Sequence, residues 1–135
     1  MPTTSTASES GPRLVSILKQ GSYLIASIHT ALSDSELLRF QADVVAQIGE
    51  LRSRGVIIDV AALDVMDSFG TRAICNVARM AKLRGAETVI VGVHPEVAIA
   101  IVQLGLELDN VHTALGLEEG LTYLDGLVGA PRGRP

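Results

Sequence analysis

The chain has 135 residues, enough for one domain with a hydrophobic core, and its net charge of -4 argues against general nucleic-acid binding, which needs clustered Lys and Arg. No apolar run approaches the roughly 20 residues that span a bilayer, so we expect no membrane segment. Hydrophobic residues make up 47% and aromatic residues only 3%, which favours a core of Val, Ile, Leu and Ala between helices and a sheet.

The two ends of the chain lack the apolar pattern of the middle. Residues 1–13 are rich in Thr, Ser and Pro without the apolar run of a signal peptide, and residues 129–135 end in Pro-Arg-Gly-Arg-Pro. We expect both ends to be disordered tails around one domain at 14–128. The single cysteine, Cys75, has no partner for a disulfide within the chain, which favours a reducing, cytoplasmic setting.

The first folded elements are expected to be a β-hairpin and a long helix. Leu14–Leu18 and Ser22–Ile28 are β-prone runs joined by a short polar connection and predict two antiparallel strands. The sequence Ser33–Glu36 then has the pattern of a capping box. Apolar residues recur behind it at helical spacing, and they predict a helix that runs to about Ser53 with Gly55 as its stop.

After this helix, strands and helices are expected to alternate. Val56–Val60 is β-branched at four of its five positions, which suits a central strand covered on both faces. The remaining expected elements are a helix at Ser68–Leu83, a strand at Glu87–Val93, a helix that begins near Pro95 with its body at Val97–Leu104, a strand at Val111–Ala114 and a helix at Leu117–Leu127. This order predicts an α/β domain with a mixed, mostly parallel sheet, an antiparallel N-terminal hairpin and about four helices packed on it.

The sequence lacks the motifs of the common enzyme classes. It contains no G-x-x-x-x-G-K-S/T loop, no G-x-G-x-x-G after a strand and no G-x-S-x-G elbow, so neither nucleotide binding nor hydrolase chemistry is supported. His29, His94 and His112 lie far apart without ligand spacing around them, so we expect no metal site and no cofactor. Asp59, in its central strand, lacks the acidic pair that a receiver-type Mg²⁺ site needs. A small α/β enzyme is therefore the least favoured interpretation.

One connection between a strand and a helix carries the most informative polar residues. Ser68 stands at the expected start of the second helix, where free backbone N–H groups and the helix dipole support an anion. Serine is also a common N-cap residue, and Asp64 and Asp67 can be plain loop and helix-start carboxylates. Gly70 removes a side chain beside the hydroxyl, and Thr71 adds a second hydroxyl nearby. From the residues alone, helix capping and a modification site both stay open for Ser68.

The run Asp67–Arg72, which follows the strand sequence Val-Ile-Ile-Asp-Val, resembles the phosphorylation loop of STAS domains, the sulfate-transporter and anti-sigma-factor-antagonist family. Three further segments, Ile17–Ser27, Arg84–Gly92 and Gln103–Leu106, are similar to stressosome proteins of the RsbS type. These segments together span nearly the whole expected domain. We therefore expect a single STAS domain.

The resemblance implies a non-enzymatic scaffold and negative regulator in the cytoplasm, within a stress-response pathway. By this likeness the chain sequesters a switch serine-protein kinase (RsbT type) and assembles with itself and with a sensor-bearing STAS co-scaffold (RsbR type). The implied phosphorylation site is Ser68, with Thr71 as a second candidate; modification releases the kinase, and a PP2C-like phosphatase (RsbX type) resets the system. The residues expected to contact the partner surround the serine: Asp64, Asp67, Phe69, Gly70 and Arg72.

A second interpretation keeps the fold and changes the function. A free-standing STAS module can act as an anti-sigma-factor antagonist, or bind a small ligand, without joining a stressosome. Such a module shares both the fold and the serine, so the sequence leaves the two interpretations open. Neither of them involves nucleic acid or a membrane.

Overall fold

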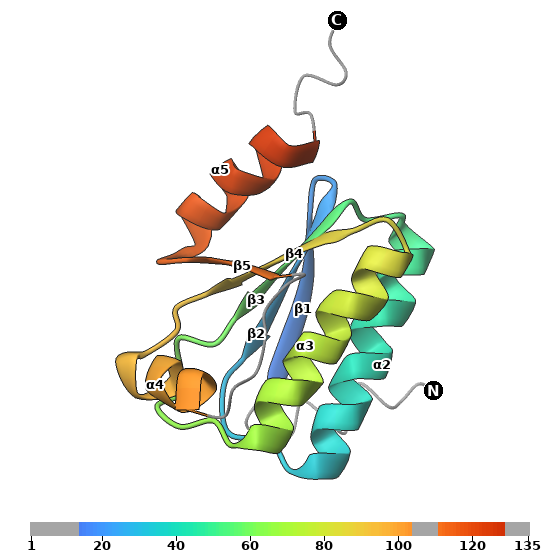
Figure 1. The fold of residues 1–135 in the computed structure, drawn as a ribbon. Coiled ribbons are helices and arrows are strands. Elements are labelled where there is room, and N and C mark those ends of the chain that lie inside the picture. Colours follow the sequence, from blue (N-terminus) through green and yellow to red (C-terminus); the bar gives the residue numbers. More distant parts are fainter. Residues whose placement is uncertain (1–13, 104–110, 129–135) are drawn as a thin grey trace, which may run out of the picture.

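A five-stranded sheet forms the middle of the domain in the computed structural model, which describes residues 14–103 and 111–128 (Figure 1). The strands are neighbours in space in the order of the chain. They are β1 (Val15–Gln20), β2 (Tyr23–Ile28), β3 (Gly55–Asp59), β4 (Glu87–Val91) and β5 (Val111–Ala114). β1 and β2 pair antiparallel, and each later pair of neighbours is parallel. The predicted mixed sheet with an N-terminal hairpin is therefore confirmed.

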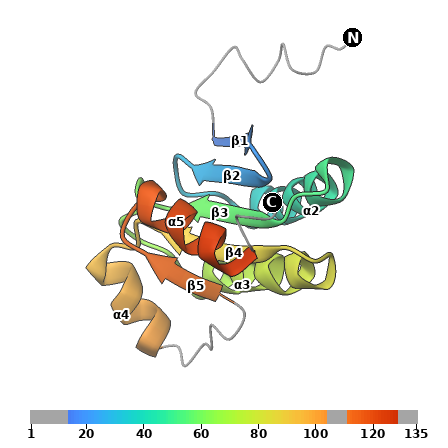
Figure 2. The same ribbon diagram turned by 90° about the horizontal axis from the view of Figure 1, so that it is seen from above.

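Helices cover both faces of this sheet. They are α2 (Asp34–Leu51), α3 (Ser68–Leu83), α4 (Pro95–Gln103) and α5 (Leu117–Val128). α2 and α3 lie side by side on one face and α5 packs on the other, whereas α4 lies beyond the β5 edge (Figure 2). Parallel neighbours need a crossover connection, usually a helix, and the four helices of the described residues agree with the prediction.

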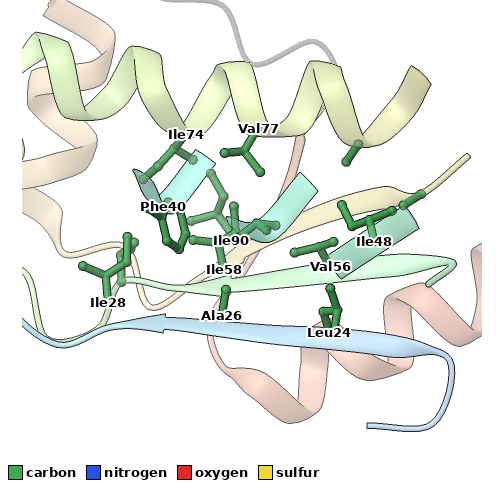
Figure 3. Close-up of a cluster of buried hydrophobic side chains, with 14 of the residues drawn as sticks. Leu24, Ala26, Ile28, Phe40, Ile48, Val56, Ile58, Ile74, Val77 and Ile90 are labelled. Atoms are coloured by element: carbon green, nitrogen blue, oxygen red, sulfur yellow. The ribbon is translucent and has the colours of Figure 1, made fainter. Parts of the chain in front are cut away.

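The larger core lies between the sheet and helices α2 and α3. Figure 3 shows Ile74 and Val77 of α3 facing Ile58 and Ile90 of the sheet, with Phe40 of α2 beside them. All five side chains are buried. Full burial of one such side chain contributes about 1.5–3 kcal/mol, so this layer is the main source of stability and fixes where α3 sits.

Helix α2 begins where the capping-box pattern predicts. The Ser33 hydroxyl accepts a hydrogen bond from the Glu36 amide (3.2 Å), and the Glu36 carboxylate accepts one from the Ser33 amide (2.7 Å). The helix ends earlier than predicted, because Leu51 is its last residue and Arg52 takes a left-handed conformation with φ 52°. The chain then turns directly into β3.

A smaller core lies under α5, on the opposite face of the sheet. Its buried members are Tyr23, Ile25, Ile57, Val89, Val91 and Leu124. Gly55 was expected to stop α2, but it is the first residue of β3 and faces α5. A Cβ added at Gly55 would lie 2.9 Å from Leu124 Cδ1. The close approach of α5 to the sheet, and not a helix end, therefore accounts for this glycine.

The other predicted boundaries are close to the observed ones, with one informative difference. β4 ends at Val91, two residues earlier than its predicted end at Val93, because Gly92 leaves the strand conformation with φ 80°. Leu104, predicted as part of the third helix, lies outside the described residues. The two predicted tails, 1–13 and 129–135, also lie outside them.

Candidate functional site

The loop between β3 and α3 lies at the carboxyl ends of the parallel strands and carries the residues that the sequence singled out (Figure 1). The loop is tied to the sheet at its start. Val60 donates a backbone hydrogen bond to the carbonyl of Val91 (3.0 Å), and Ala61 donates one to the carboxylate of Asp59 (2.9 Å). Asp59, which lacks the acidic pair of a receiver-type site, instead holds the start of the loop through this hydrogen bond.

Asp67, and not Ser68, caps helix α3. Asp67 has an extended backbone, and its Oδ1 accepts a hydrogen bond from the Gly70 amide at 2.8 Å. Its carbonyl accepts the amide of Thr71 at 3.0 Å. Ser68 is the first residue within the helix, so the interpretation of Ser68 as the N-cap is wrong. Both residue types favour this position, and only the path of the chain decides between them.

The two hydroxyl groups at the start of α3 have different surroundings. Ser68 is partly exposed, and its hydroxyl makes no hydrogen bond to any residue that the structure describes. Thr71 is only 2% exposed, and its Oγ1 donates a hydrogen bond to the Asp67 carbonyl at 3.0 Å. Of the two expected acceptors, Ser68 is therefore the more accessible one.

Most residues expected to contact a partner lie on the surface. Four of them are exposed: Asp64, Asp67, Phe69 and Arg72. Gly70 is buried, and a Cβ added there would lie 3.1 Å from Met66 Cγ. Gly70 therefore packs inside the helix start and does not present a surface, which corrects the expectation for this residue. Val65, which no sequence pattern singled out, is 75% exposed in the same loop.

Gly92 and His94, which follow β4, contact the loop from its other side, a role that no pattern in the sequence indicated. A Cβ added at Gly92 would lie 2.7 Å from the Cβ of Ala61, so the backbones approach closely here. The Nε2 of His94 lies 2.6 Å from the Ala61 carbonyl oxygen. A carbonyl only accepts, so Nε2 carries the hydrogen. A glycine and a histidine just beyond a strand could have indicated a close contact. Their partner, Ala61, could not be identified because it lies far away in the sequence.

Two features that would indicate other functions are absent from the described residues. Within 14–103 and 111–128, no group of three or more His, Cys, Asp or Glu side chains is placed to hold a metal ion. None of the helices described there combines the length and the apolar character that crossing a membrane requires.

Comparison with protein families and known proteins agrees with the fold. The model of the STAS domain matches residues 15–120. The RsbT co-antagonist protein RsbRD of Bacillus subtilis (strain 168) is 33% identical over 78 residues, which make up 58% of this chain and 28% of the relative. RsbRA of the same organism, also an RsbT co-antagonist, is 30% identical over 83 residues, or 30% of its own length. The chain therefore spans less than a third of the curated relatives that it matches.

Solved structures extend the match to almost the whole described chain. RsbS of Moorella thermoacetica, in a form with one serine replaced by glutamate, is 35% identical with a TM-score of 0.75, covering 84% of this chain and 97% of that one. A chain from the molecular architecture of the stressosome is 32% identical with a TM-score of 0.70, covering 84% of this chain and 99% of that one. The resemblance read from the sequence is confirmed.

Proposed function

Because the chain belongs to the STAS-domain family, we propose that it is a stressosome scaffold of the RsbS type, which sequesters a switch serine-protein kinase and releases it when Ser68 is phosphorylated. The similarity to RsbS of Moorella thermoacetica supports the proposal, as does the naming of the Bacillus relatives as RsbT co-antagonists. On this proposal the kinase is of the RsbT type. The chain itself acts by binding and release and catalyses no reaction.

The observation that carries the proposal is that Ser68, the first residue of α3, is partly exposed to solvent. A kinase must enclose the acceptor hydroxyl, so the acceptor has to be reachable in the folded domain. Ser68 meets this condition. Thr71 is 2% exposed with its hydroxyl already bonded to Asp67, so its modification requires the helix start to open. Ser68 is therefore the proposed site, and Thr71 is not.

Phosphorylation would concentrate negative charge at this surface. A phosphate adds about -1.5 to -2 charges at neutral pH, and the exposed Asp64 and Asp67 are close to Ser68 along the chain. Asp67 already accepts the Gly70 amide, so the helix start has less hydrogen-bonding capacity left for a phosphate than an uncapped one. Arg72, four residues after Ser68 on the same side of the helix, offsets part of the charge.

The kinase is proposed to pack on the apolar side chains beside the serine. Val65, in the loop before α3, is 75% exposed, and Phe69, in the first turn of α3, is 36% exposed. Exposed apolar side chains on both sides of the serine in the sequence suit a protein contact. A hydrated phosphate between these side chains would break the contact. Each 1.4 kcal/mol of lost binding free energy weakens affinity about tenfold, so a few kcal/mol suffice for release.

Release without refolding follows from where the core lies. Ile74 and Val77 of α3 point into the sheet and are buried, whereas Ser68 lies about two turns earlier in the helix and is partly exposed. A phosphate at Ser68 therefore changes the surface and leaves the packed face of the helix intact. The partner, and not the fold, is expected to respond.

The proposal extends to the assembly and the domain limits. We propose self-association and co-assembly with a sensor-bearing RsbR-type scaffold in the cytoplasm, with an RsbX-type phosphatase that resets Ser68. The likeness to a stressosome chain and to RsbR-type relatives supports the assembly. The proposed domain is 14–128, close to the 15–120 match of the family model.

The experiment is a pull-down of an RsbT-type kinase from the same organism, with and without ATP. We expect wild type to hold the kinase without ATP and to lose it as Ser68 is modified. Ser68→Ala should hold it in both conditions, and Ser68→Glu should bind at least about a hundredfold more weakly, the loss that a few kcal/mol produces.

The matched control is Ser22→Glu, the same change at an exposed serine. Ser22 lies in the turn between β1 and β2, at the opposite end of the domain (Figure 1). The Ser22→Glu variant should bind the kinase as wild type does. Equal capture by Ser68→Ala and Ser68→Glu, with circular dichroism showing both variants folded, would contradict the proposed switch, as would modification at Thr71 alone.

A further inference from the structure

A cavity of about 560 Å³ lies between α3, α4 and the ends of β4 and β5. We propose that this cavity binds a neutral, apolar small molecule. The inference goes beyond the proposed kinase switch, because it concerns a separate ligand and can be tested whether or not Ser68 is ever phosphorylated.

The walls of the cavity are largely aliphatic. Val60 and Ile90 contribute the sheet side, Ile74 contributes the α3 side, and Val97 and Ile101 contribute the α4 side. The volume falls within the roughly 300–1,000 Å³ of typical small-molecule sites, which are also lined mainly by apolar side chains. The cavity thus has both the size and the lining of a ligand site.

Several apolar side chains of helix α4 are not buried in the core. Its residues 97–102 are all apolar, yet Val97 is the one buried residue of the helix. Val102, which lines the cavity, is 77% exposed. A helix of this composition normally buries a broad stripe. A ligand between α4 and α3 would bury part of the surface of α4 that the core leaves open.

The charges around the cavity select an uncharged ligand. Among the described residues that line it, Glu119 is the one with a charged side chain, and its carboxylate accepts a hydrogen bond from the Leu115 amide at 2.6 Å. An anionic ligand would find no cation there and would meet this carboxylate. A cationic ligand would lose its hydration against aliphatic walls, which costs several kcal/mol unless it is fully paired. A neutral alkyl or fused-ring molecule meets neither penalty.

The cavity also reaches the start of α3. Met66 and Thr71, on either side of Ser68 in the sequence, are part of its lining. Figure 1 shows α4 at the same end of the domain as the start of α3. A bound molecule would therefore touch residues next to the proposed phosphorylation site without occupying the surface that carries Ser68.

The first test is a titration of the full chain with N-phenyl-1-naphthylamine, a neutral dye that fluoresces in apolar surroundings. Ala98 lines the cavity, whereas Ala100 on the same helix does not. We expect saturable fluorescence with wild type and with Ala100→Phe. Ala98→Phe should fill the cavity and weaken dye binding at least about tenfold. The absence of saturable binding to wild type would overturn the proposal, as would equal binding to the two phenylalanine variants.

A second measurement needs no change in the cavity. Cys75 lines the cavity and is the single cysteine of the chain, so alkylation by N-ethylmaleimide reports on this place alone. Saturating dye should slow alkylation of Cys75 at least about fivefold. The control carries Cys75→Ala together with Asn76→Cys, which moves the thiol to the exposed neighbouring position, and its rate should not respond to dye. Equal rates for Cys75 with and without dye would overturn the proposal even if Ala98→Phe failed to fold.

Discussion

The imidazole of His94 holds the backbone of Ala61, with 2.6 Å between His94 Nε2 and the Ala61 carbonyl oxygen. The two residues are 33 positions apart, one just before α4 and the other at the start of the loop that leads to Ser68. With Gly92 packed against the same alanine, this contact makes the segment after β4 a support for the loop before α3. The position of the proposed phosphorylation site thus depends on the neighbouring crossover.

Removing the His94 donor should loosen the loop. In His94→Ala the Ala61 carbonyl loses its partner, and we expect the free energy of unfolding to fall by about 0.5–1.5 kcal/mol. Amide hydrogen exchange between Ala61 and Asp67 should become faster. His94→Gln keeps an N–H donor and should recover part of both effects. Urea unfolding and exchange mass spectrometry measure them, and unchanged exchange in His94→Ala would show that the contact does not position the loop.

The identity of the helix cap can be tested by comparing two adjacent residues. Asp67→Ala removes the acceptor of the Gly70 amide and should lower the free energy of unfolding by about 0.5–2 kcal/mol. Ser68→Ala, one residue further, should change it by less than about 0.5 kcal/mol, as at an ordinary surface position. Urea unfolding of both variants decides the matter. If Ser68→Ala lowered the free energy of unfolding more than Asp67→Ala, the serine and not the aspartate would be the cap.

The close approach of Gly92 to Ala61 predicts an unequal effect of two glycine substitutions. Gly85 and Gly92 both have positive φ, 86° and 80°, so alanine at either costs about 1–2 kcal/mol of backbone strain. A Cβ at Gly85 meets nothing within 4 Å, whereas one at Gly92 would lie 2.9 Å from the Ala61 Cα. We expect Gly92→Ala to destabilise by about 1–3 kcal/mol more than Gly85→Ala in thermal or urea unfolding. Equal losses of stability in the two variants would show that the loop at Ala61 moves aside to accommodate the added Cβ without an energetic cost.

The buried thiol predicts a pH dependence. Burial raises the pKa of Cys75, and nearby Arg79 opposes this shift only in part. The thiolate is the reactive form, so alkylation of the native protein should reach half its maximum rate at higher pH than alkylation of the urea-unfolded chain. The thiol proton is held more tightly in the folded state, so stability should fall as the pH rises above the thiol pKa of the unfolded chain. Cys75→Ala should lose this dependence, and equal midpoints would contradict it.

Local rules in the sequence were sufficient for most of the fold. The capping box of Ser33 and Glu36 forms as its pattern predicts, because both hydrogen bonds join residues three apart. The apolar stripe of α3 at Ile74, Val77 and Ala81 is buried, because helical period alone brings these positions onto one face. The continuous apolar run of β3 lies in the middle of the sheet, as burial on both faces requires.

Local rules failed where two residues satisfy the same rule. Asp67 and Ser68 are both good N-cap types, and their neighbours do not separate them. Gly55 follows a helix as a stop signal would, yet its small size serves the contact with Leu124 of α5. In both cases the deciding partner lies elsewhere in the chain, so no window of sequence contains the answer.

The likeness of the Asp67–Arg72 motif to the STAS family was enough to indicate a STAS domain, and helical periodicity was enough to place Ser68 at the start of a helix, because both signals lie within short stretches of the chain. Three features became visible only in the folded domain: Asp67 is the cap, Thr71 is buried while Ser68 is partly exposed, and an apolar cavity opens beside them. Caps, exposure and cavities depend on which distant segments pack together, as His94 and Ala61 do. Which segments pack together depends on the packing of the whole core.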